Sequence, residues 1–324
     1  DFGIMEGPAA TCADLFLDPT QEQTELMLAS QGSLMQVFVG LDQGFFLEEC
    51  LTLNTIRIGT PAAQYAAMES GEIDLNLTAV PIVIAQNALS DGAFRLIGHQ
   101  GNADMTIMAA PGSGLPNAAD VGFEAAIESL RGKTIGNPAA GGIFDVFLRQ
   151  ILKAGGLDPD TDVNIVVVQY GPTAVTAMEE GQIDAYPFAW GFGAQAIADS
   201  GATPIVATGT GQIPASAGVD AMLQGAYAAR VADIQANQAA YAAFIRGTKK
   251  VKAFMADSAN RDELARIALE GFGFSEGAAQ VFADNGIAPL LGELSCAQAE
   301  LTSQNLVDFG IMEGPAATCA DLFL

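Results

Sequence analysis

Hydrophobic and polar positions along the chain predict two copies of a β-α-β-α-β unit. In the first copy, strand-like apolar patterns at 25–29 and 55–59 flank a helical pattern at 33–49. In the second copy, the strand-like patterns KTIGN and NIVVVQ flank a helical pattern at 143–154. Strand and helix patterns that alternate in this order are typical of a mostly parallel sheet covered by helices.

Each copy contains nearly the same octet, AMESGEID at 67–74 and AMEEGQID at 177–184. Ala and Met favour helix, Gly71 and Gly181 can adopt the left-handed conformation that ends a helix, and Ile-Asp opens an apolar run. We therefore predict that each octet is a helix end followed by the start of a strand. A chance match between two Ala-rich stretches is the alternative, and the matching flanks favour a duplicated unit.

The chain has 324 residues, which is enough for two domains with separate cores. A Gly/Pro/Ser-rich passage at 198–223 and a turn within 104–115 predict the crossings between them. We expect an α/β protein of two lobes, each lobe a mostly parallel sheet flanked by helices, with a ligand cleft between the lobes. Lobe 1 is predicted at 18–107 plus 214–324, and lobe 2 at 108–213.

Residues 1–17 recur letter for letter as residues 308–324. Two identical segments cannot occupy one docking site in a monomer. We expect the copy at 308–324 to hold the native position, and the copy at 1–17 to be displaced, swapped to a neighbouring molecule or artefactual. A monomer is expected unless the terminal segment is swapped.

The charge is strongly acidic, with 13 Lys and Arg against 38 Asp and Glu, a net charge of −25 and a pI near 4.1. Such a field repels nucleic acid and anionic membrane surfaces, so no nucleic-acid partner is expected. The one basic cluster, at 246–252, is predicted to be the solvated face of a helix rather than a docking patch. Apolar stretches such as 79–85 are too short to cross a bilayer, so we expect a soluble protein.

Four cysteines, Cys12, Cys50, Cys296 and Cys319, and one histidine, His99, are present, with no CxxC pair. This inventory argues against a zinc site or a Cys-His nucleophile, so no metal and no cofactor are expected. A disulfide between Cys296 and Cys319 and a pair of free buried thiols are both open interpretations. His99 is predicted to be a polar residue at a strand end.

Ligands of open parallel sheets bind beyond the carboxyl ends of the strands. The loops at those ends give the candidate ligand contacts Gln31, Ser33, Ala79, Gly141, Gly142, Tyr170, Tyr186, Phe188 and Trp190. The stretch at 138–142 precedes a predicted helix, and its backbone N–H groups favour an anionic group. A tight turn without a ligand is the simpler interpretation of the same glycines.

The stretch YPFAW places Tyr186, Phe188 and Trp190 at alternate positions, so their side chains share one side of an extended segment. Such a row can wall a pocket or form a buried sheet face. We favour the pocket for Tyr186 and Trp190, and leave Phe188 undecided. Because the candidate loops contain no Lys or Arg, a small zwitterion, a weak anion and a polar heterocycle all remain open as ligands.

An ordered set of motifs resembles a known family. They are VGLDQGFFLEECLTLNTIRIG, AMESGEIDL, SLRGKTIGNPAAGGIFDVFLRQILKAGGLDPD, AVTAMEEGQIDAY and FAWGF. The set resembles the type II periplasmic solute-binding proteins of ABC importers, in the branch that includes taurine, aliphatic-sulfonate, nitrate and thiamine-pyrimidine binders. The resemblance implies the two-lobed type II periplasmic-binding-protein fold, whose lobes close on a small solute. It also implies delivery to the transmembrane subunits of an ABC permease, and a periplasmic or extracellular, membrane-associated location. Ser33, Ala79, Gly141, Gly142 and Trp190 match loops that line the cleft in that family.

Two alternatives remain beside solute binding. An enzyme on the same fold, similar to pyrimidine-precursor synthases, would need several histidines, clustered cysteines or a strongly basic pocket. This sequence has one histidine, no CxxC pair and no Lys or Arg in the candidate loops. A sensor ectodomain would need a following membrane span or linker. We therefore expect a binding protein and not an enzyme.

Overall fold

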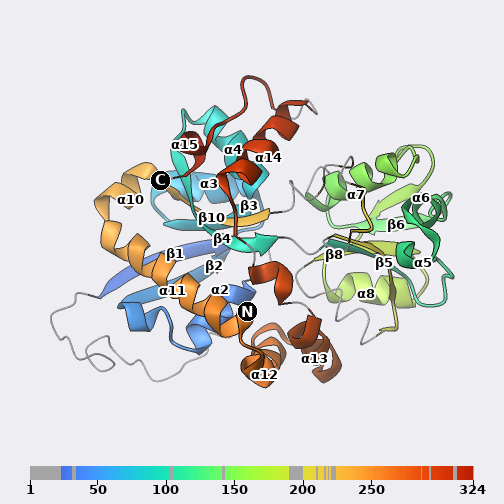
Figure 1. Cartoon of the computed structure of the whole chain (residues 1–324), viewed down its shortest axis with the longest axis horizontal. Coiled ribbons are helices and arrows are strands. Elements are labelled where there is room, and N and C mark those ends of the chain that lie inside the picture. Colours follow the sequence, from blue (N-terminus) through green and yellow to red (C-terminus); the bar gives the residue numbers. More distant parts are fainter. Residues whose placement is uncertain are drawn as a thin grey trace. The chain divides into compact units, whose positions relative to one another are not determined.

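The computed structural model describes residues 23–30, 34–102, 105–140, 143–189, 200–208, 211–214, 217, 219, 224–285, 287–291, 293–308 and 312–323 (Figure 1). The chain divides into two compact units. Unit 1 comprises the described residues up to Gly101, together with Gln224–Phe272 and Leu290–Leu324. Unit 2 comprises Asn102–Leu223 and Gly273–Pro289.

Unit 1 contains a five-stranded sheet in the order β2-β1-β3-β10-β4. Its strands are β1 (Thr24–Ser30), β2 (Leu51–Arg57), β3 (Leu75–Ala79), β4 (Phe94–Asn102) and β10 (Gln224–Arg230). β1 pairs in parallel with both β2 and β3, whereas β10 returns antiparallel to β3. The sheet is therefore mostly parallel on one side and closed by antiparallel pairing on the other.

Helices cover both faces of this sheet (Figure 1). One face carries α3 (Pro61–Ser70), α4 (Val80–Leu89) and α14 (Cys296–Asp308), whose apolar side chains form one core cluster with the sheet. On the other face Phe46 and Phe244 stack with ring centroids 5.7 Å apart and join the segment after α2 to α11. The remaining helical elements of unit 1 are α2 (Met35–Asp42), η1 (Leu47–Glu49), α10 (Val231–Ala236), α11 (Gln238–Ala256), η3 (Ser258–Asn260), α12 (Arg261–Phe272), η4 (Ala288–Leu291) and α15 (Cys319–Leu322).

Unit 2 repeats this architecture with a sheet in the order β7-β6-β8-β5-β9. Its strands are β5 (Met105–Ala109), β6 (Thr134–Asn137), β7 (Asn164–Val167), β8 (Ala185–Ala189) and β9 (Thr203–Ala207). Its helices are α5 (Ala118–Val121), α6 (Phe123–Glu128), α7 (Ile143–Ala154), α8 (Pro172–Glu179) and α13 (Glu276–Asn285). β6 pairs in parallel with β7 and β8, and β5 pairs antiparallel with β8 and β9. Both units thus show the predicted α/β class with helices on mostly parallel sheets.

The two octets fold alike. The Glu72 N–H donates to the Ala67 carbonyl at 2.9 Å, and the Gln182 N–H donates to the Ala177 carbonyl at 2.9 Å, which closes the end of each helix. Gly71 and Gly181 adopt the left-handed conformation that this closure requires, with φ of 75° and 68°.

The aspartate that ends each octet fixes the next strand to its neighbour. Asp74 Oδ2 accepts from the Met27 N–H at 2.8 Å, and Asp184 Oδ2 accepts from the Thr134 N–H at 2.9 Å. Each aspartate also donates its own N–H to the carbonyl of the same partner, at 2.9 Å and 2.7 Å respectively. The repeated octet is therefore a structural device that ends a helix and sets the start of a central strand.

Several element boundaries differ from the sequence prediction. The helix expected at 33–49 ends at Asp42, because the chain turns through Gly44, at φ of 73°, before a short 3-10 helix. The strand expected at 55–59 begins earlier, at Leu51, and ends at Arg57. His99 lies inside β4 and is buried, rather than at the strand end, because the strand continues to Asn102.

The division into units also differs from the predicted one. The segment Gly273–Pro289 groups with unit 2, although the whole stretch 214–324 was expected in lobe 1. It contains α13, and its Phe274 and Phe282 are buried with ring centroids 6.1 Å apart. An amphipathic helix pattern shows which face is apolar but not which sheet that face covers, so the sequence could not assign this helix.

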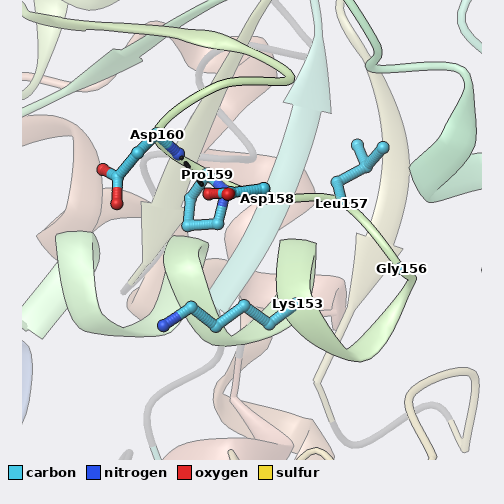
Figure 2. Close-up of a pocket in the computed structure, with 6 residues that line it drawn as sticks. All are labelled: Lys153, Gly156, Leu157, Asp158, Pro159 and Asp160. Carbon is cyan, nitrogen blue, oxygen red and sulfur yellow. Dashed lines mark hydrogen bonds between the residues drawn. The ribbon is translucent and has the colours of Figure 1, made fainter.

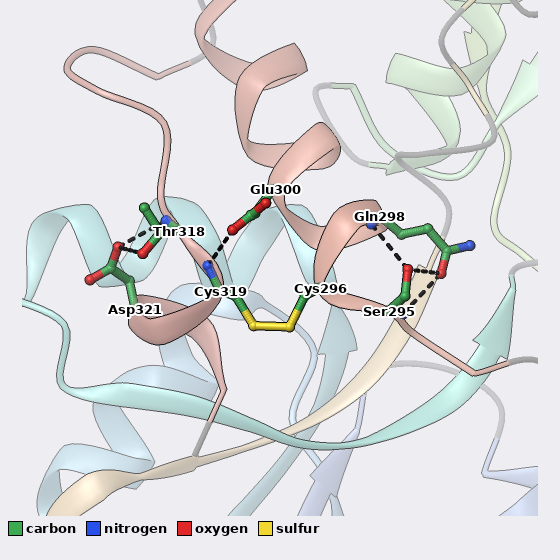
Figure 3. The surroundings of a disulfide bond; sticks show 7 residues. All are labelled: Ser295, Cys296, Gln298, Glu300, Thr318, Cys319 and Asp321. Atoms are coloured by element: carbon green, nitrogen blue, oxygen red, sulfur yellow. Dashed lines mark hydrogen bonds between the residues drawn. A yellow bond between two sulfur atoms is a disulfide. The ribbon is translucent and has the colours of Figure 1, made fainter.

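The C-terminal copy of the duplicated segment packs on unit 1. A disulfide joins Cys296 at the start of α14 to Cys319 in α15 (Figure 3). Leu322 is fully buried, and Phe323 forms a parallel bridge with Leu96 of β4. Residues 1–17 lie outside the described residues, so the predicted fate of that copy stays a prediction.

The basic cluster at 246–252 forms ion pairs along α11. Arg246 and Lys250 contact Glu49 at 2.5 Å and 2.7 Å, and Lys252 contacts Glu293 at 3.0 Å. Over the described residues, no helix has the length and apolar character needed to cross a membrane.

Candidate functional site

The carboxyl end of β6 carries a buried polar cluster. Asn137, the last residue of β6, is 1% exposed, and its Nδ2 donates to the Ala139 carbonyl at 3.1 Å and to Asp145 Oδ1 at 3.0 Å. Asp145, in the first turn of α7, also receives a hydrogen bond from Arg149 at 3.0 Å. The cluster fixes the loop between β6 and α7, which was predicted to contact an anionic group.

This cluster leaves little free positive charge at the loop. Arg149 pairs with Asp160 at 2.6 Å as well as with Asp145. Hydrogen bonding to Asp160 raises the pKa of Arg149 above its ordinary value, so the guanidinium stays charged and paired. A solute at this loop would therefore depend on backbone donors and the dipole of α7 rather than on this arginine.

Asn137 and Asp145 were not among the predicted contacts. Their signal in the sequence was an amide at the end of a strand followed, eight positions later, by an acid in the first turn of a helix. That signal is weak alone, because Asn and Asp at such positions also serve turns and helix caps.

Tyr170 ties the loop after β7 to the end of β8. Its hydroxyl donates to the Ala189 carbonyl at 2.6 Å and accepts from the Ala189 N–H at 2.9 Å. Its ring centroid lies 4.9 Å from that of Phe144 in the first turn of α7. Tyr170 therefore joins three loops at the carboxyl end of this sheet.

Two of the predicted aromatic contacts, Tyr186 and Phe188, lie in the core of unit 2. Both are fully buried on the face of the sheet that α8 covers, with ring centroids 4.7 Å apart. The Tyr186 hydroxyl donates to the Val168 carbonyl at 3.0 Å, and burial raises the pKa of this phenol. The structure brings both rings within 6.3 Å of the Tyr170 ring, and contact with a solute stays a prediction for all three.

Ala79 occupies the corresponding end of a strand in unit 1. It ends β3 and precedes α4, which begins without a side-chain cap and with a proline in its first turn. By contrast, α3 is capped by Thr60, whose hydroxyl oxygen accepts from the Ala63 N–H at 3.3 Å. The small side chain of Ala79 and the uncapped helix start leave backbone N–H groups as the available donors at this loop.

The other predicted contacts, Gln31, Ser33, Gly141, Gly142 and Trp190, lie outside the described residues. Among the described residues, no group of three or more His, Cys, Asp or Glu side chains is placed to hold a metal ion.

A surface hollow of about 500 Å³ in unit 2 lies away from these loops (Figure 2). It is lined by Lys153 in the last turn of α7 and by residues 156–160, which lead toward β7. Because α7 runs from the carboxyl end of β6 toward the amino end of β7, the hollow lies at the amino ends of the strands. Parallel sheets bind ligands at the opposite ends, so we do not assign the hollow to the site.

Comparisons with known proteins agree with this architecture. A family model described as the NMT1-like family matches residues 18–269, so the chain belongs to that family. No curated protein matches the chain.

Solved structures with the same fold include binding proteins. The alkanesulfonate-binding protein SsuA from Xanthomonas axonopodis pv. citri, bound to MOPS, is 14% identical with a TM-score of 0.69 and covers 94% of this chain and 99% of its own. The periplasmic nitrate-binding protein NrtA from Synechocystis PCC 6803 is 15% identical with a TM-score of 0.68 and covers 92% of this chain and 85% of its own. These matches confirm the resemblance to periplasmic solute-binding proteins and their α/β fold.

A third structure with this fold is a mutant of DSZB in complex with biphenyl-2-sulfinic acid. It is 15% identical with a TM-score of 0.65 and covers 93% of this chain and 96% of its own.

Proposed function

We propose that this protein captures a small polar solute outside the cytoplasm and delivers it to an ABC permease. The observation that carries the proposal is the family match over residues 18–269, on a fold shared with sulfonate-binding and nitrate-binding proteins. The solute class is a sulfonate or taurine-like compound, another small organic anion, or a nitrogen heterocycle. The location that goes with this function is the periplasm or the outer surface of a membrane.

The described loops suit binding better than chemistry. At the carboxyl end of β6 Asp145 accepts hydrogen bonds from both Asn137 and Arg149, and at Ala79 the helix start offers backbone donors. Such groups recognise a solute by shape, dipoles and hydrogen bonds and need no activated side chain.

Catalysis on the same fold is the second candidate, because the DSZB mutant bound to biphenyl-2-sulfinic acid shares the fold. In this chain Cys50, Cys296 and Cys319 are disulfide-bonded. A disulfide-bonded sulfur supplies no thiolate, so these three residues do not favour a cysteine nucleophile. This observation supports the binding function over the catalytic one.

The test is a thermal-shift panel of alkanesulfonates, taurine, nitrate and pyrimidines at millimolar concentration. One class should raise the Tm and change the fluorescence of Trp190, the one tryptophan of the sequence. Trp190→Ala should weaken binding by more than about 1 kcal/mol if the indole contacts the solute. Lys153→Ala, in the surface hollow, is the matched control and should leave binding unchanged.

The catalytic candidate predicts a different result. Turnover of a sulfonate or sulfinate by the purified protein, with no solute of the panel raising the Tm, would reject the binding function. Loss of affinity in Lys153→Ala comparable to that in Trp190→Ala would instead place the site at the hollow.

A further inference from the structure

The side-chain amide of Gln36 joins three parts of unit 1 that are far apart in the sequence. Gln36 lies in the first turn of α2 and is 1% exposed. Its Nε2 donates to the carbonyl of Gln100 in β4 and, at 2.7 Å, to the carbonyl of Leu290 in η4. Its Oε1 accepts from the hydroxyl of Tyr227 in β10 at 3.2 Å. Both donor hydrogens and the acceptor oxygen of this buried amide are therefore engaged.

These partners lie beside the points where the chain passes between the two units. The unit boundaries fall between residues 101 and 102, 223 and 224, 272 and 273, and 289 and 290. Gln100 lies just before the first boundary, Tyr227 shortly after the second, and Leu290 directly after the fourth. The side chain of Gln36 is thus hydrogen-bonded to the unit 1 ends of three of these four chain crossings, which we call the connections.

Packing around Gln36 reinforces this arrangement. A Cβ at Gly225 would lie 2.6 Å from Oε1 of Gln100, so the Gln100 side chain rests against the backbone of β10. The Tyr227 ring lies 4.9 Å from that of Phe244, and burial raises the pKa of its phenol, which keeps the hydroxyl protonated as a donor. The connections next to Gln100 and Tyr227 therefore pack against each other directly. The hydrogen bonds of Gln36 add the connection next to Leu290 to this pair.

We propose that Gln36 is a positioning residue that couples the solute loop, meaning the predicted contacts Gln31 and Ser33 that precede α2 in the sequence, to the connections between the units. Gln36 follows the predicted contact Ser33 by three residues, so a shift at the start of α2 reaches Gln36 directly. Because Gln36 is hydrogen-bonded to Gln100, Tyr227 and Leu290, a shift of Gln36 either moves these three segments or is opposed by them. The effect on solute affinity rests on the proposed function, whereas the effect on the connections does not.

The test compares Gln36→Leu with Asn87→Leu. Asn87 is the matched control, because it is another buried amide of unit 1, donates to the Phe94 carbonyl at 3.0 Å and accepts from the Phe94 N–H at 2.9 Å. Its hydrogen bonds to Phe94 lie at the start of β4, away from the connections. Tyr227→Phe is a milder second variant, because it removes only the hydroxyl that contacts Oε1.

Hydrogen exchange of the solute-free protein is the first readout. We expect amides at 98–102, 224–227 and 290–291 to exchange at least tenfold faster in Gln36→Leu, and two- to tenfold faster in Tyr227→Phe. Asn87→Leu should leave these amides within twofold of the parent protein. Unchanged exchange in Tyr227→Phe, or equal acceleration in Asn87→Leu, would overturn the proposal even if Gln36→Leu fails to fold.

Solute affinity is the second readout. With a solute that raises the Tm of the parent protein, Gln36→Leu should weaken affinity at least fivefold, and Asn87→Leu less than twofold. An affinity within twofold of the parent in Gln36→Leu, with accelerated exchange at the connections, would reject the coupling to the solute loop. If the parent protein binds no solute of the panel, the proposed function fails, and the exchange readout still decides the role of Gln36 at the connections.

Discussion

The two units use the same backbone device in different electrostatic surroundings. Asp74 and Asp184 each fix the start of a central strand through the same pair of backbone hydrogen bonds. Asp184 also contacts Lys133 at 3.3 Å. Burial raises the pKa of Asp74, and the nearby carboxylates of Asp233 and Glu25 raise it further, against the opposing hydrogen bond from Met27. The two aspartates therefore share their backbone hydrogen bonds, whereas the charged groups around them differ between the units.

The units also fill the space between sheet and helix differently. In unit 1 Ala29 pairs with Asn76 across the sheet, and the aromatic ring comes from the helix, at Tyr65. In unit 2 the ring comes from the strand, at Tyr186, and Gly136 on β6 leaves room for it. The comparison teaches that a duplicated backbone tolerates exchange of large and small side chains between layers, provided that the packed volume is preserved.

The largest expected effect concerns Gly136→Ala. Its Cβ would lie 2.6 Å from the Tyr186 ring and 2.7 Å from Ile183 Cδ1, which is closer than packed side chains allow. We expect a loss of about 2–3 kcal/mol in the free energy of unfolding, measured by denaturant titration. Ala29→Gly, the matched change in unit 1, should cost about 1–2 kcal/mol, through backbone entropy and the loss of one buried methyl group. Equal costs at the two positions would show that the ring does not need the glycine.

Smaller changes in the free energy of unfolding are expected at the matched positions Asn76 and Tyr186, and the two changes should have opposite signs. Asn76 is fully buried, and neither its Nδ2 nor its Oδ1 has a hydrogen-bond partner in the described structure, whereas the Tyr186 hydroxyl has Val168. Asn76→Leu should raise the free energy of unfolding by about 1 kcal/mol, because an unpaired buried amide is costly. Tyr186→Phe should lower it by about 1 kcal/mol through loss of a hydrogen bond. Destabilisation by both changes would contradict the cost assigned to the unpaired amide of Asn76.

The smallest effect separates the two aspartates by charge. Asn retains the oxygen that accepts from the strand N–H, so Asp74→Asn and Asp184→Asn test charge rather than geometry. Asp184→Asn should cost about 0.2–1 kcal/mol at pH 7, because it loses the partly exposed pair with Lys133. Asp74→Asn should be neutral or stabilising by less than about 1 kcal/mol at pH 7, after discounting for its partial exposure.

The pH dependence gives the sign of the Asp74 effect. The native pKa of Asp74 lies above its ordinary value, so the native state binds more protons than the unfolded state between those two values. The contribution of Asp74 to stability therefore falls as pH rises through this interval. Unfolding measured from pH 3 to pH 7 should show the relative advantage of Asp74→Asn growing with pH, and a constant difference would contradict the role of charge.

Much of the fold could be predicted from local patterns. The alternation of strand and helix, the helix ends at Gly71 and Gly181, and the start of a strand after each octet follow from residue spacing and from the conformations that glycine permits. β10 was missed, because its sequence QGAYAAR contains no β-branched residue. Its strand conformation comes from antiparallel pairing with β3, which no local pattern specifies.

The candidate site was also predicted from the sequence only in part. The sequence placed Ala79 and Tyr170 at loops beyond strands, because the order of strands and helices fixes where such loops lie. It could not show that the Tyr170 hydroxyl would bind the backbone of Ala189, nor that Asn137 would be held by Asp145. These contacts join separate loops that meet only after the sheet forms.

The sequence by itself determined the α/β class, the duplicated unit and the family resemblance, because these depend on periodicity and on short ordered motifs. Tertiary structure alone decided that the Tyr186 and Phe188 rings are buried beneath α8, that α13 belongs to unit 2, and that Gln36 meets Gln100, Tyr227 and Leu290. The physical reason is that side-chain burial and long-range hydrogen bonds depend on which surfaces the folded chain brings together. A pattern along the chain specifies an apolar face or a polar group, and only packing specifies its partner.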